Sequence, residues 1–309
     1  MPITYPGGSD RLTVEAYLKR PNYIARALTD LALKRIVADK IFASGTADQV
    51  AGGAAIYQKS ESIFPSATQL AEEVGVRAEY PRTGWTEQIF TALVHKYGLE
   101  VPISDEARRR NAFDQVARAQ RKLANALVKF VDTLAMTTLL ADSDVGTTTA
   151  SADWSTSTTD IIFDIARARN SIDAQDEGYS ADTLIVNPAQ ELDLMADKDI
   201  RDAMPREGSA NMVMSGSPIP ILGLSQIVVT NALTAGTVLI LESGVCGTIA
   251  DETPLSDEGY QSYSPGAAQA TVYAKTYRND ETDEMIVRGA RFPAMWIAEP
   301  KAVYKFTSG

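Results

Sequence analysis

The sequence predicts an α+β protein, and three features carry the prediction. From about residue 72, apolar and polar side chains alternate, which is typical of strands. From about residue 104, apolar side chains recur every three or four positions, which predicts one very long helix. Residues 160–264 mix short apolar runs with helical patterns and predict a compact α/β lobe. The 309 residues are enough for one large domain or two smaller ones.

Composition excludes several protein classes. Cys246 is the only cysteine, so neither an internal disulfide nor a cysteine-rich metal site is available. The first residues lack the basic and then apolar layout of a signal peptide, and we expect no segment long and apolar enough to span a bilayer. These features predict a protein that is cytosolic at synthesis, in a reducing compartment.

Charge is unevenly spread along the chain. The net charge is −11, but residues 171–260 alone hold 15 acidic and 3 basic side chains, a net −12. Residues 101–140 hold 7 basic and 4 acidic side chains, a net +3. The acidic total argues against a stand-alone DNA-binding protein, because neutralising phosphates requires a basic patch.

The N-terminal region predicts an arm followed by a helix. Residues 1–20 are weakly patterned and are expected to be extended. Pro21 suits a first helical turn, and Ile24, Leu28 and Leu31 then share one helix face. Residues 39–53 are small and polar, and we interpret them as a connection.

Residues 72–102 predict a long β-hairpin. Residues 74–80 alternate, 81–84 form a turn, and 89–101 form the second strand. A two-stranded hairpin is marginal alone, and no neighbouring strand pattern covers it. We therefore expect it to lie on another subunit. The residues expected to make that contact are Val74, Val76, Arg77, Tyr80, Trp85, Ile89, Leu93 and Tyr97.

The long helix is predicted to begin after the N-cap Ser104 and to run to about residue 140 without Gly or Pro. Its apolar stripe comprises Phe113, Val116, Gln120, Leu123, Leu127, Phe130 and Leu134. Basic residues lie along the same helix. They suit contact with DNA phosphate or with a neighbour's acids, or a solvated face, and the alternatives stay open. The candidates are Arg108, Arg109, Arg110, Arg118 and Arg121.

The remaining elements are short. Asp160 is expected to cap a helix with Ile161, Ile165, Ala168 and Ile172 on one face, and Asn187 with Pro188 to begin another. The predicted strands are 183–186, 227–229, 238–241, 270–277, 285–290, 294–298 and 302–306.

No catalytic constellation is recognisable. His95, the only histidine, is expected to pack mid-strand, and Cys246 to be a structural thiol. Nucleotide-binding, hydrolase and metal-loop motifs are missing, so we predict no catalytic, cofactor or metal residues and no enzyme. A hydrolase using paired carboxylates in residues 171–260 stays a less favoured alternative.

Three stretches carry a resemblance to a known family: residues 95–106, where strand passes into helix, 182–188, and 215–224. In order and spacing they resemble the tailed-phage major capsid proteins of the Hong Kong 97 fold. The resemblance implies the following domains: 1–45 N-terminal arm and helix, 46–71 peripheral domain, 72–102 extended loop, 103–159 peripheral domain with the spine helix, 160–264 axial domain, and 265–309 peripheral return strands.

The same resemblance implies the function. Subunits would form hexamers and pentamers that close into an icosahedral shell around double-stranded DNA, in a virion assembled in the bacterial cytoplasm. A separate scaffolding protein and a portal are implied partners, and a membrane is not. Some members join Lys to Asn covalently; Lys59 and Asn279 are conceivable partners, although nothing local supports the pairing. An encapsulin-like compartment with protein cargo is the alternative.

Overall fold

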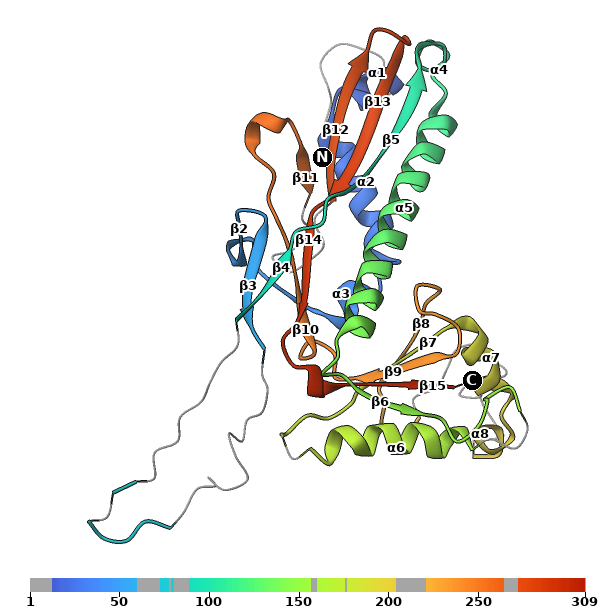
Figure 1. Ribbon diagram of the computed structural model, residues 1–309. Coiled ribbons are helices and arrows are strands. Elements are labelled where there is room, and N and C mark those ends of the chain that lie inside the picture. Colours follow the sequence, from blue (N-terminus) through green and yellow to red (C-terminus); the bar gives the residue numbers. More distant parts are fainter. Residues whose placement is uncertain are drawn as a thin grey trace, which may run out of the picture. The chain divides into compact units, whose positions relative to one another are not determined.

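The computed structural model describes residues 13–59, 73–77, 79–80, 89–156, 160–175, 177–203, 221–263 and 272–308. The chain divides into two compact units (Figure 1). The first unit comprises Met1–Ile36, Val94–Val131 and Asp251–Pro293. The second comprises Val37–Leu93, Asp132–Ala250 and Ala294–Gly309. The fold is the predicted α+β class, and both units are built from segments far apart in the sequence.

The first unit packs helices on a four-stranded antiparallel sheet of order β11-β12-β13-β5. Leu28 of one helix and Leu123 and Leu127 of another meet this sheet at Gly289, and all three leucines are buried. The elements are α1 (Val14–Leu18), α2 (Pro21–Leu33), β5 (Tyr97–Ser104), α4 (Asp105–Arg109), the first part of α5 (Phe113–Ala141), η2 (Ser256–Glu258), β11 (Gln261–Tyr263), β12 (Val272–Asn279) and β13 (Glu284–Arg291).

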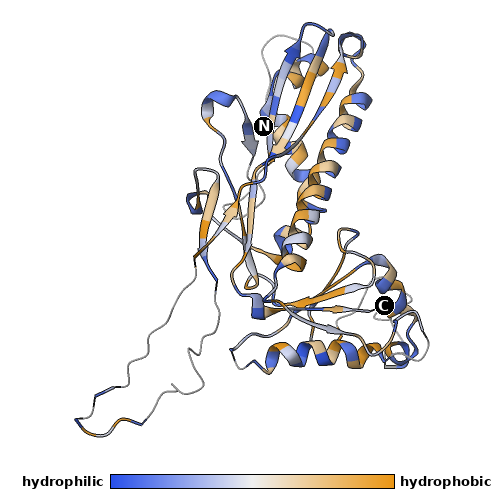
Figure 2. Ribbon diagram, viewed as in Figure 1, coloured by the Kyte–Doolittle hydropathy of each residue, from blue (hydrophilic) through white to orange (hydrophobic). Residues whose placement is uncertain are grey.

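The second unit contains a five-stranded mixed sheet of order β6-β15-β9-β7-β8. Helix α6 packs against it with the buried residues Ile161, Ile165, Ala168 and Ile172, as predicted, and Figure 2 shows polar and apolar residues alternating along that helix. The elements of this lobe are β6 (Gly146–Thr149), α6 (Ile161–Asp173), β7 (Thr183–Val186), α7 (Pro188–Ala196), α8 (Lys198–Ala203), β8 (Gln226–Val229), β9 (Thr237–Leu241), η3 (Pro300–Ala302) and β15 (Val303–Thr307).

Two small sheets complete the second unit, with orders β1-β10-β14 and β2-β3-β4. Gly247 of β10 must be glycine, because a Cβ there would lie 2.4 Å from the backbone oxygen of Trp296. The elements are α3 (Ala38–Ile41), β1 (Ala43–Ser44), η1 (Ala47–Gln49), β2 (Val50–Ala51), β3 (Ala54–Gln58), β4 (Ile89–Leu93), β10 (Gly247–Asp251) and β14 (Pro293–Ile297).

The predicted hairpin is wrong in its pairing. Strand β4 pairs with β3, a strand that the sequence analysis missed, while the described residues among 73–80 form no strand. The predicted second strand, 89–101, is also two strands. At His95 the backbone N–H donates to the oxygen of Pro293, and from Tyr97 onward β5 pairs with β13. His95 is therefore exposed between two strands and does not pack mid-strand.

The predicted long helix is interrupted. Ser104 caps α4 as expected, accepting a hydrogen bond from the N–H of Ala107, but α4 ends at Arg109. Asn111 has a positive φ of 54°, a conformation that asparagine tolerates better than most residues, and its side chain accepts from the N–H of Val14. The tertiary contact therefore ends α4, and α5 begins at Phe113.

Three further expectations are corrected. Phe113 and Phe130 are 38% and 52% exposed, so they lie outside the buried stripe of α5. Residues 14–18 of the predicted arm are helical, because Val14 and Leu18 are buried; residues 1–12 of the arm lie outside the described residues. By length and composition α5 could cross a membrane, contrary to the expectation, although half of the window concerned is buried inside the protein.

Candidate assembly surfaces

The β3–β4 ladder has two apolar sides with opposite environments. On one side, Tyr57 stacks between Phe90 and Trp296, with ring centroids 5.8 and 5.9 Å apart. On the other side, Ile56, Ile89 and Leu93 are 75%, 69% and 64% exposed. Alternation along paired strands places these two sets on opposite faces. The second set is an exposed apolar face, which we call the outer face of the ladder.

Lys59, directly after β3, is held by partly buried ion pairs with Asp142 and Asp144. Its Nζ lies 2.7 Å from Asp142 Oδ1, contacts Asp144, and lies 5.4 Å from the ring centroid of Phe90. Burial alone would lower the pKa of Lys59, but its hydrogen bonds to the two carboxylates outweigh this and raise it. Lys305 also binds at this end of α5, donating to the backbone oxygen of Leu140. The Lys59 ammonium is thus engaged within its own chain.

The structure places the predicted contact residues as follows. Val76 and Tyr80 are 98% and 79% exposed, Arg77 is exposed and Val74 is half-buried. Ile89 and Leu93 lie on the outer face of the ladder, and Trp85 lies outside the described residues. The structure brings Ile89 and Leu93 together on one strand face, with Ile56 as a neighbour that sequence reasoning missed.

Tyr97 belongs to a separate aromatic ladder in the first unit. Its ring stacks on Phe130 at 5.6 Å and 8°, and on His95 at 6.0 Å and 17°. Phe130 is half-exposed and His95 is exposed. This group was not predicted, because helical periodicity alone assigns Phe130 to the buried stripe of α5.

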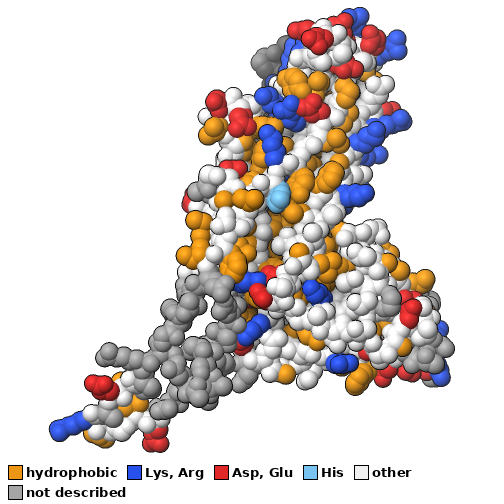
Figure 3. Space-filling model, viewed as in Figure 1, with side chains coloured by type: hydrophobic (Ala, Val, Ile, Leu, Met, Phe, Trp, Pro, Cys, Tyr) orange, Lys and Arg blue, Asp and Glu red, His pale blue; other side chains and the backbone are white. Residues whose placement is uncertain are grey.

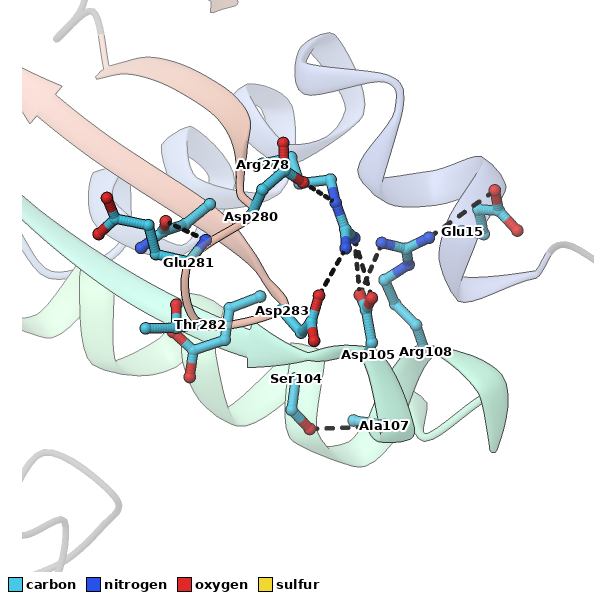
Figure 4. A network of polar contacts seen from close by, with 12 residues as sticks. Glu15, Ser104, Asp105, Ala107, Arg108, Arg278, Asp280, Glu281, Thr282 and Asp283 are labelled. Carbon is cyan, nitrogen blue, oxygen red and sulfur yellow. Dashed lines mark hydrogen bonds and ion pairs between the residues drawn. The ribbon is translucent and has the colours of Figure 1, made fainter.

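Arg108 is part of a polar network and not of a free basic face (Figure 4). Its guanidinium pairs with Asp105 at 2.9 Å and with Glu15 at 3.9 Å. Arg278, next to the β12–β13 turn, also binds Asp105, and it pairs with Asp283 at 3.1 Å. The hydrogen bond from Arg278 is the main cause that lowers the pKa of Asp105. The network joins α1, α4 and that turn within the first unit.

The other predicted basic residues are exposed. Arg109 and Arg110 lie at the end of α4, and Arg118 and Arg121 lie on α5, where Lys122 and Lys129 are also exposed. Figure 3 shows blue side chains along the edge formed by α5.

Titratable groups give no recognisable reaction centre in the described part of the chain. No group of three His, Cys, Asp or Glu side chains there could hold a metal ion. Cys246 is fully buried, and burial raises the pKa of its thiol to about 12. A thiol held in this way is protonated at neutral pH and is a poor nucleophile.

Comparison with known proteins gives the family and the fold. The model of the family described as phage capsid protein matches residues 88–306, well over half of the chain. No curated protein matches the sequence. Among solved structures, the chain is similar to a virus-like particle from Pyrococcus furiosus, at 13% identity and a TM-score of 0.58, over 92% of this chain and 97% of that one.

The chain is also similar to two phage structures. The match to Mycobacterium phage Che8 has 13% identity and a TM-score of 0.55, over 99% of this chain and 98% of that one. The match to the mature capsid of bacteriophage PhiM1 has 10% identity and a TM-score of 0.57, over 88% and 86%. At identities this low, the structural matches concern the fold alone. They confirm the predicted Hong Kong 97 fold. The family match adds the function: the chain belongs to the phage capsid protein family and is a structural subunit of an icosahedral virion shell, not an enzyme.

Proposed function

We propose that the chain forms hexamers and pentamers, that these close around double-stranded DNA, and that the outer face of the β3–β4 ladder is a contact between neighbouring copies. The exposure of Ile56, Ile89 and Leu93 on a single small sheet carries the proposal. Apolar patches that a soluble chain leaves open commonly mark interaction sites. In a capsid protein, the partner present in the largest number is another copy of the same chain.

The extended loop supports the same proposal. Its described residues Val76 and Tyr80 are almost fully exposed, and β4 and β3 are the strands from which residues 60–88 depart. Lys59, buried against Asp142 and Asp144, fixes the backbone at this point of departure. We propose that residues 74–97 contact a neighbour through the apolar side chains predicted from the sequence, with Ile56 added to that set.

A double variant, Ile56→Ser with Leu93→Ser, tests the contact. The free energy of unfolding of the dissociated subunit should change by no more than about 0.5 kcal/mol, since exposed substitutions are close to neutral. Closed shells seen by electron microscopy should be lost or strongly reduced. The matched control is Leu192→Ser with Leu255→Ser, which changes two leucines outside the ladder that are 66% and 70% exposed. The control should form more closed shells than the ladder variant. Normal shells from the ladder variant would contradict the proposed contact.

A scaffolding protein and a portal belong to the same proposal, as does DNA as cargo. Shells purified from infected cells should contain nucleic acid that resists nuclease until the shell is opened. Shells that hold only protein would instead favour the compartment alternative.

A further inference from the structure

From residue 115 to residue 131, the exposed side of α5 carries basic side chains and no Asp or Glu. Arg118, Arg121, Lys122 and Lys129 are exposed, while Val116, Leu123 and Leu127 face the core. At 100° per residue the four cations lie within about 100° of one another, opposite the buried residues. Residues 115–131 contain these four basic side chains and no Asp or Glu, in a chain whose net charge is −11. We call these four residues the α5 cation row.

Folding alone does not explain the row. Like charges three or four residues apart destabilise a helix by roughly 0.2–0.5 kcal/mol per pair, and Arg118 has such neighbours in Arg121 and Lys122. Asp114, four residues before Arg118, offsets only one of these two pairs. Within the described residues no carboxylate forms an ion pair with any of these three. Arg35, at the end of α2, adds another positive charge on the same side, because its guanidinium donates to Asn125 of α5.

The neighbours of the row favour nucleic acid over protein as its partner. The other exposed residues of this stretch are Phe113, Asp114, Gln115, Asn125 and Phe130. At 100° per residue both phenylalanines lie about 80° outside the arc of the four cations, so no apolar anchor lies among them. Protein interfaces are depleted in Lys at their core and enriched in aromatic residues. A phosphate backbone needs only positive charge along a line.

We infer that the α5 cation row binds the phosphate backbone of double-stranded DNA without reading sequence, an inference that rests on the proposed DNA cargo. Arg118 and Lys129 are eleven residues apart, which is about 16 Å along the helix axis. Duplex DNA carries a charge for every ~1.7 Å of its axis, so each long side chain can reach a phosphate. Because only a few phosphates would be contacted, the binding should be weak and dependent on salt.

The test is the salt dependence of DNA binding by Arg118→Gln with Arg121→Gln and Lys122→Gln. Binding of a labelled 30-base-pair duplex to the full-length subunit is measured by fluorescence anisotropy from about 20 mM salt upward. Because each phosphate contact contributes about 0.9 to the slope of log K against log salt, the triple variant should reduce that slope by about 2.7. The matched control, Lys19→Gln with Arg26→Gln and Arg201→Gln, removes three exposed charges elsewhere and should keep the wild-type slope.

Equal slopes for the wild type and the row variant, or no wild-type binding at low salt, would overturn the inference. Electron microscopy of the same variant separates the competing partner. Shells of normal number and size support DNA as the ligand, whereas loss of shells from folded subunits would assign the row to a neighbour's acids. Wild-type protein that binds DNA but forms no shells would instead contradict the proposed assembly.

Discussion

Both sides of the β3–β4 ladder carry large apolar residues, but their environments are opposite. Tyr57 stacks between Phe90 and Trp296 on one side, whereas Ile56, Ile89 and Leu93 are exposed on the other. Burying a side chain of this size stabilises by roughly 1.5–3 kcal/mol, so the chain forgoes several such contributions on its open side. Folding therefore accounts for the first side, and the proposed contact between copies would account for the second.

The largest expected effect is the loss of folding stability on removal of the Trp296 side chain. Trp296→Ala deletes a buried ring that stacks on Tyr57, and it should lower the free energy of unfolding by about 3–5 kcal/mol. Urea denaturation of the dissociated subunit measures this. Phe163→Ala, an aromatic residue that is 56% exposed, is the control and should change stability by about 0.5 kcal/mol or less. A loss from Trp296→Ala as small as that from Phe163→Ala would contradict the assignment of Trp296 to a buried side of the ladder.

Helix α5 allows a buried and an exposed apolar side chain to be compared within a single element. Leu127→Ala should cost about 2–5 kcal/mol, because Leu127 is buried against the sheet. Phe130→Ala should cost only about 0.5–1.5 kcal/mol, the value of its ring pair with Tyr97. Both are measured by denaturation. A Phe130 variant as destabilised as the Leu127 variant would mean that the stripe predicted from the sequence is the correct one.

The polar network around Asp105 extends the comparison to charge. Because Arg278 lowers the pKa of Asp105, the network's contribution is fully present above the carboxyl's unfolded value near 4 and is lost as pH falls through the lower folded value. Thermal unfolding from pH 6 down to pH 2 should show this loss in the wild type. Asp105→Asn should flatten that part of the profile, and an unchanged profile would contradict the assignment.

The smallest expected effect is the reaction of the Cys246 thiol with an alkylating reagent in the folded protein. Its thiol is buried and its pKa is raised to about 12, so an alkylating reagent at pH 8 should modify it only after unfolding. Mass spectrometry at increasing urea concentrations follows the modification. Rapid labelling of the native subunit would show that the site opens locally.

Local signals could predict much of the fold. The caps Ser104, Asp160 and Asn187 act as predicted, since each depends on its own side chain and the next turn. Strand β7 was predicted with its bounds, because a buried strand is apolar throughout. The β12–β13 pair followed from two apolar runs around a polar turn.

What failed depends on partners distant in sequence. The pairing of β4 with β3 crosses a loop of thirty residues, and nothing in Ala54 or Ala55 signals a strand. Asn111 ends α4 through its contact with Val14, 97 positions away. Strand β15 was predicted among the peripheral return strands, yet it pairs with β9 and β6 of the lobe sheet. The sequence alone shows which residues of the predicted contact surface are apolar. The grouping of Ile56 with Leu93 on one face follows only from the register of β3 and β4.

The position of β15 has a consequence for synthesis. It lies between β6 and β9 inside the five-stranded sheet and buries Val303 and Phe306. A ribosome must therefore translate past Thr307 before that sheet can close, and a nascent or prematurely terminated polypeptide has a gap where β15 belongs. We expect such fragments to be cleaved by proteases more readily than the full-length polypeptide and to be poor building blocks for a shell.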